Sequence, residues 1–382
     1  MSFSKGKRSD NTTPRPGFFI LEELEARGWA QSDLAFILGI SVNALNPIIT
    51  GRRSISTEFA KALGKAFDVP AEFFSNLQMA HEHSMTNEPD HGIEKRARLH
   101  ERLPIREMVK RGWLLETSDS SELESRVAAF FKVNSVDEVP YLRHAAKKTT
   151  YEERNIDPAQ LAWLFRVRQI AELIPAPRYD VKKLKFALGR MSELRIEPEG
   201  IRFVPQLLAD SGVRFVLVEK LAQGKIDGVC FWSEGQPVIG MSLRFDRIDN
   251  FWFVLAHEIE HVLRGHGKKK EILDDLDGSR ALQGLELPEE ERIANAAASE
   301  FCVARSELKD FIARKQPYIS ERDVIGFASR LRIHPGLVVG QIHATTQNFR
   351  FLRKHLVKVR EYLTRFAVSD GWGNLFPVLE QV

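Results

Sequence analysis

Residues 253–266 read FVLAHEIEHVLRGH, with two histidines four positions apart and a glutamate directly after the first. Residues four apart lie on one face of a helix, so His257 and His261 can bind the same zinc ion. Glu258 can then act as general base toward a metal-bound water, which is the chemistry of peptide hydrolysis. Because the chain has 11 histidines, this pattern also arises by chance. A half-buried helix whose histidines bond to neighbours is therefore the alternative.

The surrounding residues predict that this helix is largely buried. Apolar side chains recur from Phe251 to Val262, an Asp249 or Asn250 cap is expected at the start, and Gly265 is expected to end the helix.

Composition limits the classes of protein to which the chain can belong. With 382 residues, 43% hydrophobic and 28% charged, it has the size of two or three globular domains. No apolar run is long enough for a bilayer, and the polar, basic start is not a signal peptide, so we expect a cytoplasmic protein. The two cysteines, Cys230 and Cys302, are too few for a cysteine-based zinc site or a disulfide framework. Any metal must use histidine and carboxylate ligands.

Residues 17–78 are predicted to form a compact set of short helices. Residues 30–51, AQSDLAFILGISVNALNPIITG, give a helix, a turn at Gly39, a cap at Ser41 and a second helix that ends at Gly51. This order is that of a helix-turn-helix, whose second helix enters the major groove of DNA. Pro47 lies inside that second helix and predicts a kink. A module of the same shape used only for protein contacts is the alternative.

Five residues of this module are candidates for DNA contacts. The start of the second helix faces base edges and the residues after it face phosphates, which selects Ser41, Asn43, Asn46, Arg52 and Arg53. Residues 1–80 hold nine Lys/Arg and eight Asp/Glu, a net charge of only +1. Binding must therefore also use the basic residues of the tail, which are Lys5, Lys7, Arg8 and Arg15. We expect a homodimer on palindromic double-stranded operator DNA.

The rest of the chain divides by composition. We expect a disordered basic tail at 1–16, the helix-turn-helix domain at 17–78, a polar linker at 79–103 and a helical connector at 104–200. Short β-rich runs then begin the metal-binding domain at 201–345. The linker histidines form a second conceivable metal cluster, although a solvated polar segment also explains them: His81, His83, His91 and His100.

The carboxyl-terminal segment 346–382 is basic. It holds six cationic residues among apolar ones, namely Arg350, Arg353, Lys354, Lys358, Arg360 and Arg365. This pattern is typical of a partner or nucleic-acid surface, or of an amphipathic strand or helix with one solvated face. No internal repeat is visible.

A catalytic zinc site needs a third protein ligand. His266 follows His261 by five residues, one fewer than the metzincin spacing, so we assign it a supporting role next to the ligands. Residues 287–301, LPEEERIANAAASEF, predict a helix in which Glu291 can ligate, while Asn295 lies one turn later and can orient a ligand. A solvated acidic first turn is the alternative for Glu291.

The stretch AHEIEH, followed about thirty residues later by ERIANAAASEF, resembles the ImmA/IrrE family of metallopeptidases. Residues 16–78 resemble, nearly end to end, a helix-turn-helix domain of the XRE/HigA-antitoxin type. These resemblances imply zinc on His257, His261 and Glu291, with Glu258 as the base. They also imply a multi-domain fold: an all-α helix-turn-helix domain, a helical connector and an α+β zincin-like domain with a small sheet.

The expected function combines the two resemblances. We expect a transcriptional regulator, of antitoxin or repressor type, coupled to a zinc-dependent peptidase of the gluzincin kind that cleaves a regulatory partner protein. A toxin and a repressor are the candidate partners. The alternative is a DNA-binding antitoxin or repressor whose zincin-like domain is a non-catalytic sensor or protein-docking module.

Overall fold

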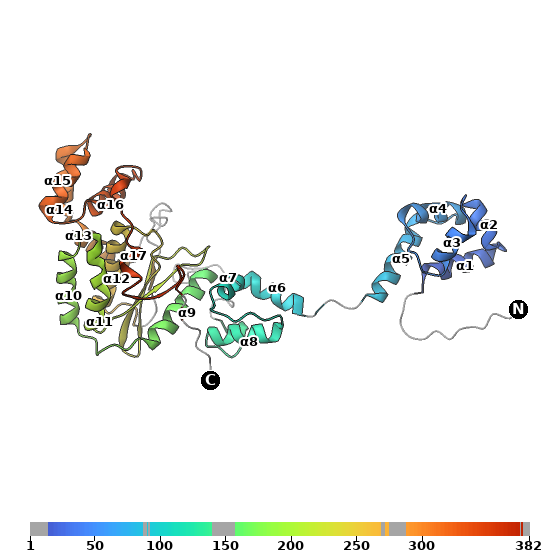
Figure 1. Cartoon of the computed structure of the whole chain (residues 1–382), viewed down its shortest axis with the longest axis horizontal. Helices are drawn as coiled ribbons and strands as arrows, with labels where there is room; N and C mark the ends of the chain where they lie inside the picture. The colour runs from blue at the N-terminus through green and yellow to red at the C-terminus, as the bar shows by residue number, and fades with distance from the viewer. Residues whose placement is uncertain are drawn as a thin grey trace. The chain divides into compact units, whose positions relative to one another are not determined.

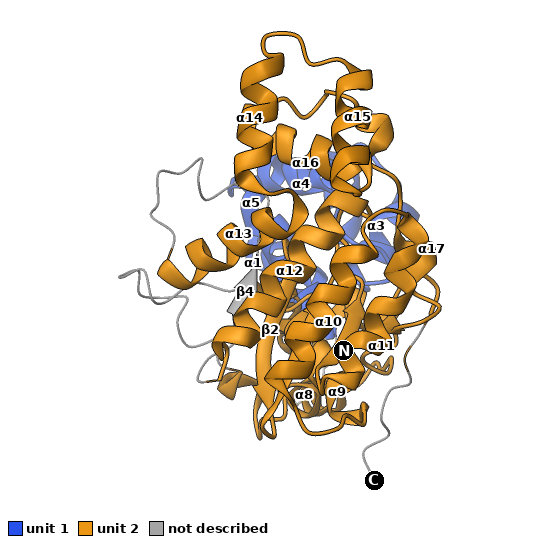
Figure 2. Ribbon diagram, turned by 90° about the vertical axis from the view of Figure 1, so that its left-hand side faces the viewer, with its two compact units in different colours: residues 1–91 blue, residues 92–382 orange. Residues whose placement is uncertain are grey.

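The structure is a computed structural model that describes residues 14–86, 90, 92–139, 157–268, 272–274, 288–374 and 376. It divides into two compact units, residues 1–91 and residues 92–382, which are described separately (Figure 2). The tail residues Lys5, Lys7 and Arg8 and the linker residue His91 lie outside the described residues.

Unit 1 is all helical (Figure 1). Its helices are α1 Pro16–Arg27, α2 Gln31–Ile37, α3 Val42–Ile49, α4 Thr57–Phe67 and α5 Ala71–Met85. The turn between α2 and α3 contains Gly39 at φ 66°, and Ser41 caps α3 by accepting a hydrogen bond from the N–H of Ala44. One apolar core joins the helices, with Leu34, Leu45 and Leu63 fully buried. The predicted helix-turn-helix is confirmed, and α3 runs as one helix through Pro47.

Unit 2 is built on a five-stranded mixed sheet in the order β4-β2-β3-β1-β5. The strands are β1 Arg214–Val218, β2 Gly228–Ser233, β3 Gln236–Met241, β4 Ile272–Asp274 and β5 Val368–Asp370. β1 pairs in parallel with β3 and β5, whereas β2 pairs antiparallel with β3 and β4. The β-rich runs of the sequence are β1, β2 and β3. The carboxyl-terminal segment supplies β5, so it is part of the sheet.

Four helices from the predicted linker and connector share a core on one side of the sheet, and the last of them packs against β1. They are α6 Gly92–Arg102, α7 Ile105–Lys110, α8 Ser120–Phe130 and α9 Pro158–Leu173. Val216 and Val218 of β1 share a core with these helices. The helices α7, α8 and α9 of segment 104–200 share this core and belong to unit 2. Residues 79–103 contain the end of α5 and all of α6.

On the other side of the sheet, the remaining helices share a second core. These are α10 Val181–Glu193, α11 Val204–Asp210, α12 Ile248–Arg264, α13 Glu289–Cys302, α14 Arg305–Lys315, α15 Glu321–Leu331, α16 Pro335–Thr346 and α17 Arg360–Leu363, with 3₁₀ turns at Pro198–Phe203 and Arg353–His355. Phe215 and Leu217 of β1 point into this core, alternating with Val216 and Val218 as strand geometry requires. Helices α14, α15 and α16 gather at one end of unit 2 (Figure 2). The predicted fold class, an all-α unit and an α+β unit with a small sheet, is confirmed.

The turn that ends α15 has the same backbone hydrogen bond as the turn that ends α2. Ile333 donates to the carbonyl of Ala328 at 3.0 Å, as Ile40 donates to the carbonyl of Ala35 at 3.0 Å. Arg332 has a φ of 56° where Gly39 has 66°. Each of these residues lies 293 positions after its counterpart, without a gap. The same hydrogen bond and a residue with positive φ also end α1 and α12, so this is the common motif of helix ends and not an internal repeat.

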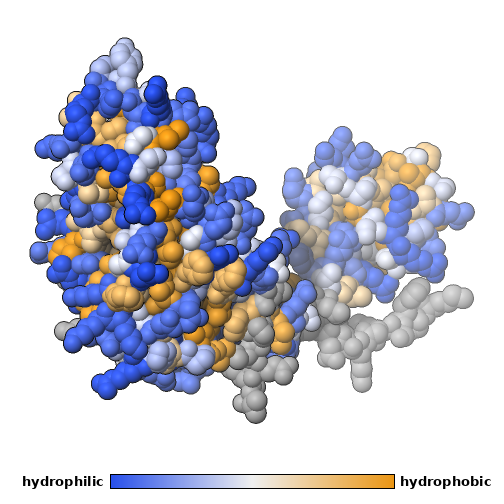
Figure 3. Space-filling view, turned by 60° about the vertical axis from the view of Figure 1, so that its left-hand side comes forward, coloured by the Kyte–Doolittle hydropathy of each residue, from blue (hydrophilic) through white to orange (hydrophobic). Residues whose placement is uncertain are grey.

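Among the described residues, no single helix has both the length and the apolarity to cross a membrane. The pair α2 and α3 passes that test only together, with a bend of 113° between its members. Hydrophilic residues cover much of the face seen in Figure 3, and hydrophobic residues lie among them. A cytoplasmic location remains a prediction.

Candidate metal centre

Helix α12 carries the two histidines and lies in the core between the sheet and the outer helices. Its buried residues include His257, Glu258 and His261 beside a continuous apolar surface. The helix begins at Ile248 after Arg247, so the expected cap at Asp249 or Asn250 is wrong. Asp249 instead accepts hydrogen bonds from the guanidinium of Arg247 at 3.0 and 2.6 Å. Gly265, at φ 70°, ends the helix as predicted.

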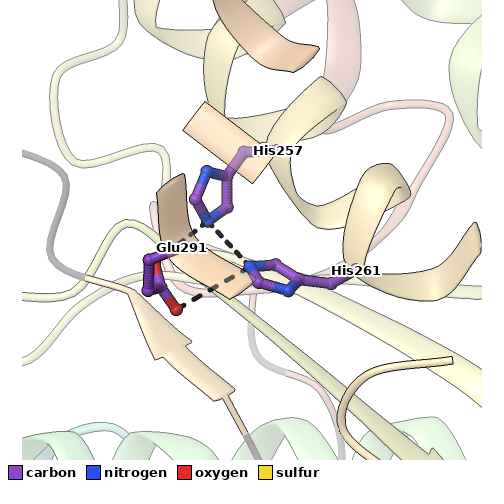
Figure 4. A group of neighbouring side chains, drawn as sticks. All are labelled: His257, His261 and Glu291. Atoms are coloured by element: carbon purple, nitrogen blue, oxygen red, sulfur yellow. Dashed lines mark hydrogen bonds and ion pairs between the residues drawn. The ribbon is translucent and has the colours of Figure 1, made fainter. Parts of the chain in front are cut away.

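Helix α13 brings a carboxylate to the histidines. Ala294, Ala298 and Cys302 are buried with Glu291 along one side of the helix, and α13 packs against α12. The short side chains of the two alanines let the helix axes approach closely. As a result Glu291, only 5% exposed, points at the two imidazoles (Figure 4).

Three possible ligand atoms converge between the two helices (Figure 4). The Nε2 atoms of His257 and His261 are 3.0 Å apart, and the Glu291 carboxylate oxygens lie 3.5 Å from the first and 3.8 Å from the second. Ligands about 2.0–2.1 Å from a tetrahedral zinc ion are roughly 3.3 Å from one another. The spacing and the donor types, two imidazoles and a carboxylate, therefore fit zinc.

Glu258 lies next to His257 on α12 and has no exposed surface. Its carboxylate packs against the backbone of Gly228 at the start of β2, where a Cβ atom would overlap it. Glycine at this position of the sheet thus makes room for the candidate base, a relationship that the sequence pattern of β2 did not reveal.

The two predicted supporting residues differ in their contacts. His266 Nδ1 lies 2.9 Å from Nδ1 of His261, and His266 Nε2 lies 4.0 Å from a carboxylate oxygen of Glu290. Asn295 is partly buried one turn after Glu291, and it makes no hydrogen bond with the three candidate ligands in the described part of the chain. The structure therefore brings His266 into the centre more directly than Asn295.

The described linker histidines, His81, His83 and His100, do not form a comparable group. Within the described residues, His257, His261 and Glu291 are the cluster of at least three possible ligands whose ligand atoms lie within 4.8 Å of one another. His81, His83 and His100 are spread over α5 and α6 and belong to no such cluster.

The candidate DNA contacts lie on and after α3. The side chains of Asn43, Asn46, Arg52 and Arg53 are exposed. The hydroxyl of Ser41 is used in capping, at 3.2 Å from the Ala44 nitrogen. The described tail residue Arg15 donates from its guanidinium to the carbonyl of Thr50 at 2.7 Å, which holds its charge beside the end of α3.

Acidic residues elsewhere in unit 2 partly neutralise the positive charge of the carboxyl-terminal segment. Lys354 pairs with Glu321 at 2.8 Å, and Arg360 lies 3.6 Å from Asp246. These two cations therefore have acidic partners within unit 2.

The fold and the centre define a class of protein, a helix-turn-helix regulator joined to a metallopeptidase-like domain. Residues 20–74 match the helix-turn-helix family, and residues 210–339 match peptidase family M78, the IrrE N-terminal-like domain. The chain is thus a fusion of an XRE-type helix-turn-helix domain with an ImmA/IrrE-like domain, as its sequence motifs predicted.

Curated relatives are similar only in the amino-terminal part. The HTH-type transcriptional regulator YbaQ of Escherichia coli K12, described as uncharacterized, is 33% identical over 75 residues, which is 19% of this chain and 66% of that protein. The protein of the same name from Escherichia coli O6:H1 matches equally. The chain therefore spans slightly less than two thirds of these relatives.

Proposed function

We propose that this protein is a transcriptional regulator in which a DNA-binding unit is coupled to a zinc-dependent peptidase that cleaves a regulatory partner protein. The convergence of the His257 and His261 imidazoles with the Glu291 carboxylate carries this proposal. Two imidazoles, one carboxylate and an open fourth position are the donor set of many zinc peptidases.

The residues of the centre would have different roles in the proposed hydrolysis. His257, His261 and Glu291 would hold the ion, and zinc, when bound, would polarise a peptide carbonyl and lower the pKa of a water. Glu258 would accept the proton of the attacking water and return it to the leaving amine. Because Glu258 is fully buried, its surroundings have a low dielectric constant, which would strengthen its electrostatic interactions with the ion and the attacking water.

A second candidate function is a non-catalytic metal sensor or docking module. It is favoured by burial, because His257, Glu258 and His261 have no exposed surface and Glu291 is 5% exposed. A peptide must reach the metal for hydrolysis, whereas a sensory or structural metal needs no such access. The two functions share the same ligands and differ in what Glu258 does.

The DNA-binding part of the proposal rests on unit 1. The exposed Asn43 and Asn46 would contact base edges, and Arg52 and Arg53 would bind phosphates. The small net charge of residues 1–80 supports binding as a homodimer on two half-sites. Within the chain we propose residues 17–78 as the DNA-binding domain and residues 201–345 as the peptidase domain.

The metal content of the purified full chain tests the common basis of both functions. We expect about one zinc per chain in the parent protein and loss of that zinc in His257→Ala and in His261→Ala. His355→Ala is the matched control, because His355 bonds to Glu321 at 2.8 Å and belongs to no ligand cluster among the described residues. Full zinc occupancy in both ligand variants would contradict the assignment.

A further inference from the structure

We propose that His266 is a positioning residue that accepts a hydrogen bond from Nδ1 of His261, and so keeps Nε2 of His261 free of a proton for the metal. This inference rests on the proposed zinc centre and adds the residue that prepares one of its ligands. The two Nδ1 atoms are 2.9 Å apart, which is hydrogen-bonding distance.

Backbone contacts fix the place of His266. At Gly265 the chain reverses, which lets the N–H of His266 bond to the carbonyl of His261 at 2.9 Å. The carbonyl of His266 accepts from the indole N–H of Trp232 on β2 at 2.8 Å. Gly267 lies so close to β2 that a Cβ there would be 2.7 Å from the carbonyl oxygen of Cys230. The imidazole of His266 is therefore placed by both the helix end and the sheet.

One arrangement of protons is compatible with metal binding. A hydrogen bond between two neutral imidazoles needs one donor and one acceptor. If His266 donated, the proton of neutral His261 would lie on Nε2, the atom that faces Glu291 at 3.8 Å and His257 at 3.0 Å. If His261 donates, its Nε2 has a free lone pair for the ion. His266 then has its own proton on Nε2, which faces the Glu290 carboxylate at 4.0 Å.

Strand β2 supports the centre at two points. Gly228 and Trp232, four residues apart, lie on the same side of the strand. Because Gly228 has no side chain, the Glu258 carboxylate fits against it. The indole N–H of Trp232 donates a hydrogen bond to the carbonyl of His266. The strand therefore positions both the candidate base and the residue that orients a ligand, which explains how contacts from the sheet reach a centre built on two helices.

Two variants of similar size separate hydrogen bonding from packing. In His266→Asn, Oδ1 takes the place of Nδ1 and can still accept from His261. In His266→Leu, the side chain has a similar shape but no acceptor. Zinc affinity of the full chain, measured by competition with a chromophoric chelator, should fall about 10–100-fold in the Leu variant and remain near the parent value in the Asn variant. Co²⁺ absorption spectra report the ligand geometry independently.

Thermal unfolding of the metal-free proteins tests for a merely structural role, and both variants should unfold close to the parent temperature. Trp232→Phe provides another test if the Leu variant folds poorly, because it removes the donor to the His266 carbonyl while keeping an aromatic ring, and it should weaken zinc binding in the same direction. Parent-like zinc affinity in His266→Leu overturns the positioning role while the zinc centre stands. Equal losses in the Asn and Leu variants overturn it as well. A parent protein without zinc affinity refutes the proposed centre itself.

Discussion

His334 and Ser41 each cap the first turn of a helix through a side-chain acceptor, His334 on α16 and Ser41 on α3. The Nδ1 atom of His334 accepts from the N–H of Gly336 at 3.0 Å, and the hydroxyl of Ser41 accepts from the N–H of Ala44 at 3.2 Å. The two helices have different surroundings. The start of α3 is exposed, whereas residues 336–339 of α16 are buried. A Cβ at Gly340 would lie 2.5 Å from the Cβ of Asp249, so α16 packs directly against α12, which carries His257 and His261.

The helix-turn-helix of unit 1, in which the start of α3 is exposed, should therefore bind DNA. Asn43→Ala should relax sequence preference, because an asparagine can pair with one base edge. Arg52→Ala should weaken binding to all sequences alike and reduce the slope of log affinity against log salt by about one. Mobility-shift titrations at several salt concentrations measure both effects.

The matched control for DNA binding is Gln341→Ala on α16, which should bind as the parent does. A reduced salt slope in this variant would contradict the assignment of DNA binding to unit 1. Unchanged binding in both Asn43→Ala and Arg52→Ala would show that unit 1 uses another surface.

The His334 cap should make unit 2 sensitive to mild acid. Burial, and secondarily repulsion from His355, lower the pKa of His334 below its usual 6.5, while Glu199 opposes the shift. The unfolded chain thus binds a proton more readily than the folded one. The stability that neutral His334 contributes is full above about pH 6.5 and is lost as the pH falls from there through the folded pKa.

The replacement His334→Asn isolates this effect, because an asparagine Oδ1 can still cap α16 but does not titrate. Denaturant unfolding of the parent and the variant between pH 5 and pH 8 measures it. The variant should lose less stability than the parent as the pH falls, and parallel curves would contradict the role of His334.

Arg166 and Asp370 should matter far more than an exposed ion pair. They join α9 to β5 with side chains only 3% and 1% exposed, and Trp113 donates to the same carboxylate at 3.0 Å. Asp370→Ala leaves a buried guanidinium without its acid and should lower the free energy of unfolding by about 3–5 kcal/mol.

The control for this pair is Glu307→Ala, which removes an exposed partner of Arg330 and should cost less than about 1 kcal/mol. Urea unfolding monitored by tryptophan fluorescence compares the two variants. Similar losses of stability in both would show that the buried pair does not secure β5.

The same strand shows why part of the fold could not be predicted. β1, β2 and β3 are five or six residues long and apolar, so their periodicity is visible in the sequence. β5 has only three residues, and its position depends on pairing with β1 and on Arg166, 204 residues earlier.

The metal centre was predictable to the extent that helix periodicity determines it. The four-residue spacing places His257 and His261 on one face, and the acidic start of α13 indicated Glu291. Contacts made across the sheet were not visible in the same way. Gly228 is separated from Glu258 by 30 residues, and Trp232 from the carbonyl of His266 by 34. Only tertiary packing brings these pairs together.

Glu258 distinguishes the proposed peptidase from the sensor. Because its proposed task is proton transfer and not metal binding, Glu258→Gln should leave zinc occupancy and folding nearly unchanged. The amide cannot accept the proton, so hydrolysis of the partner protein should fall by about two to four decades. Glu291→Ala should instead lower zinc affinity and hydrolysis together. The measurements are zinc content, the fate of the partner and reporter expression in cells that carry each variant. If Glu258→Gln processes its partner and regulates as the parent does while His257→Ala fails, the metal is sensory or structural, and the peptidase proposal is wrong.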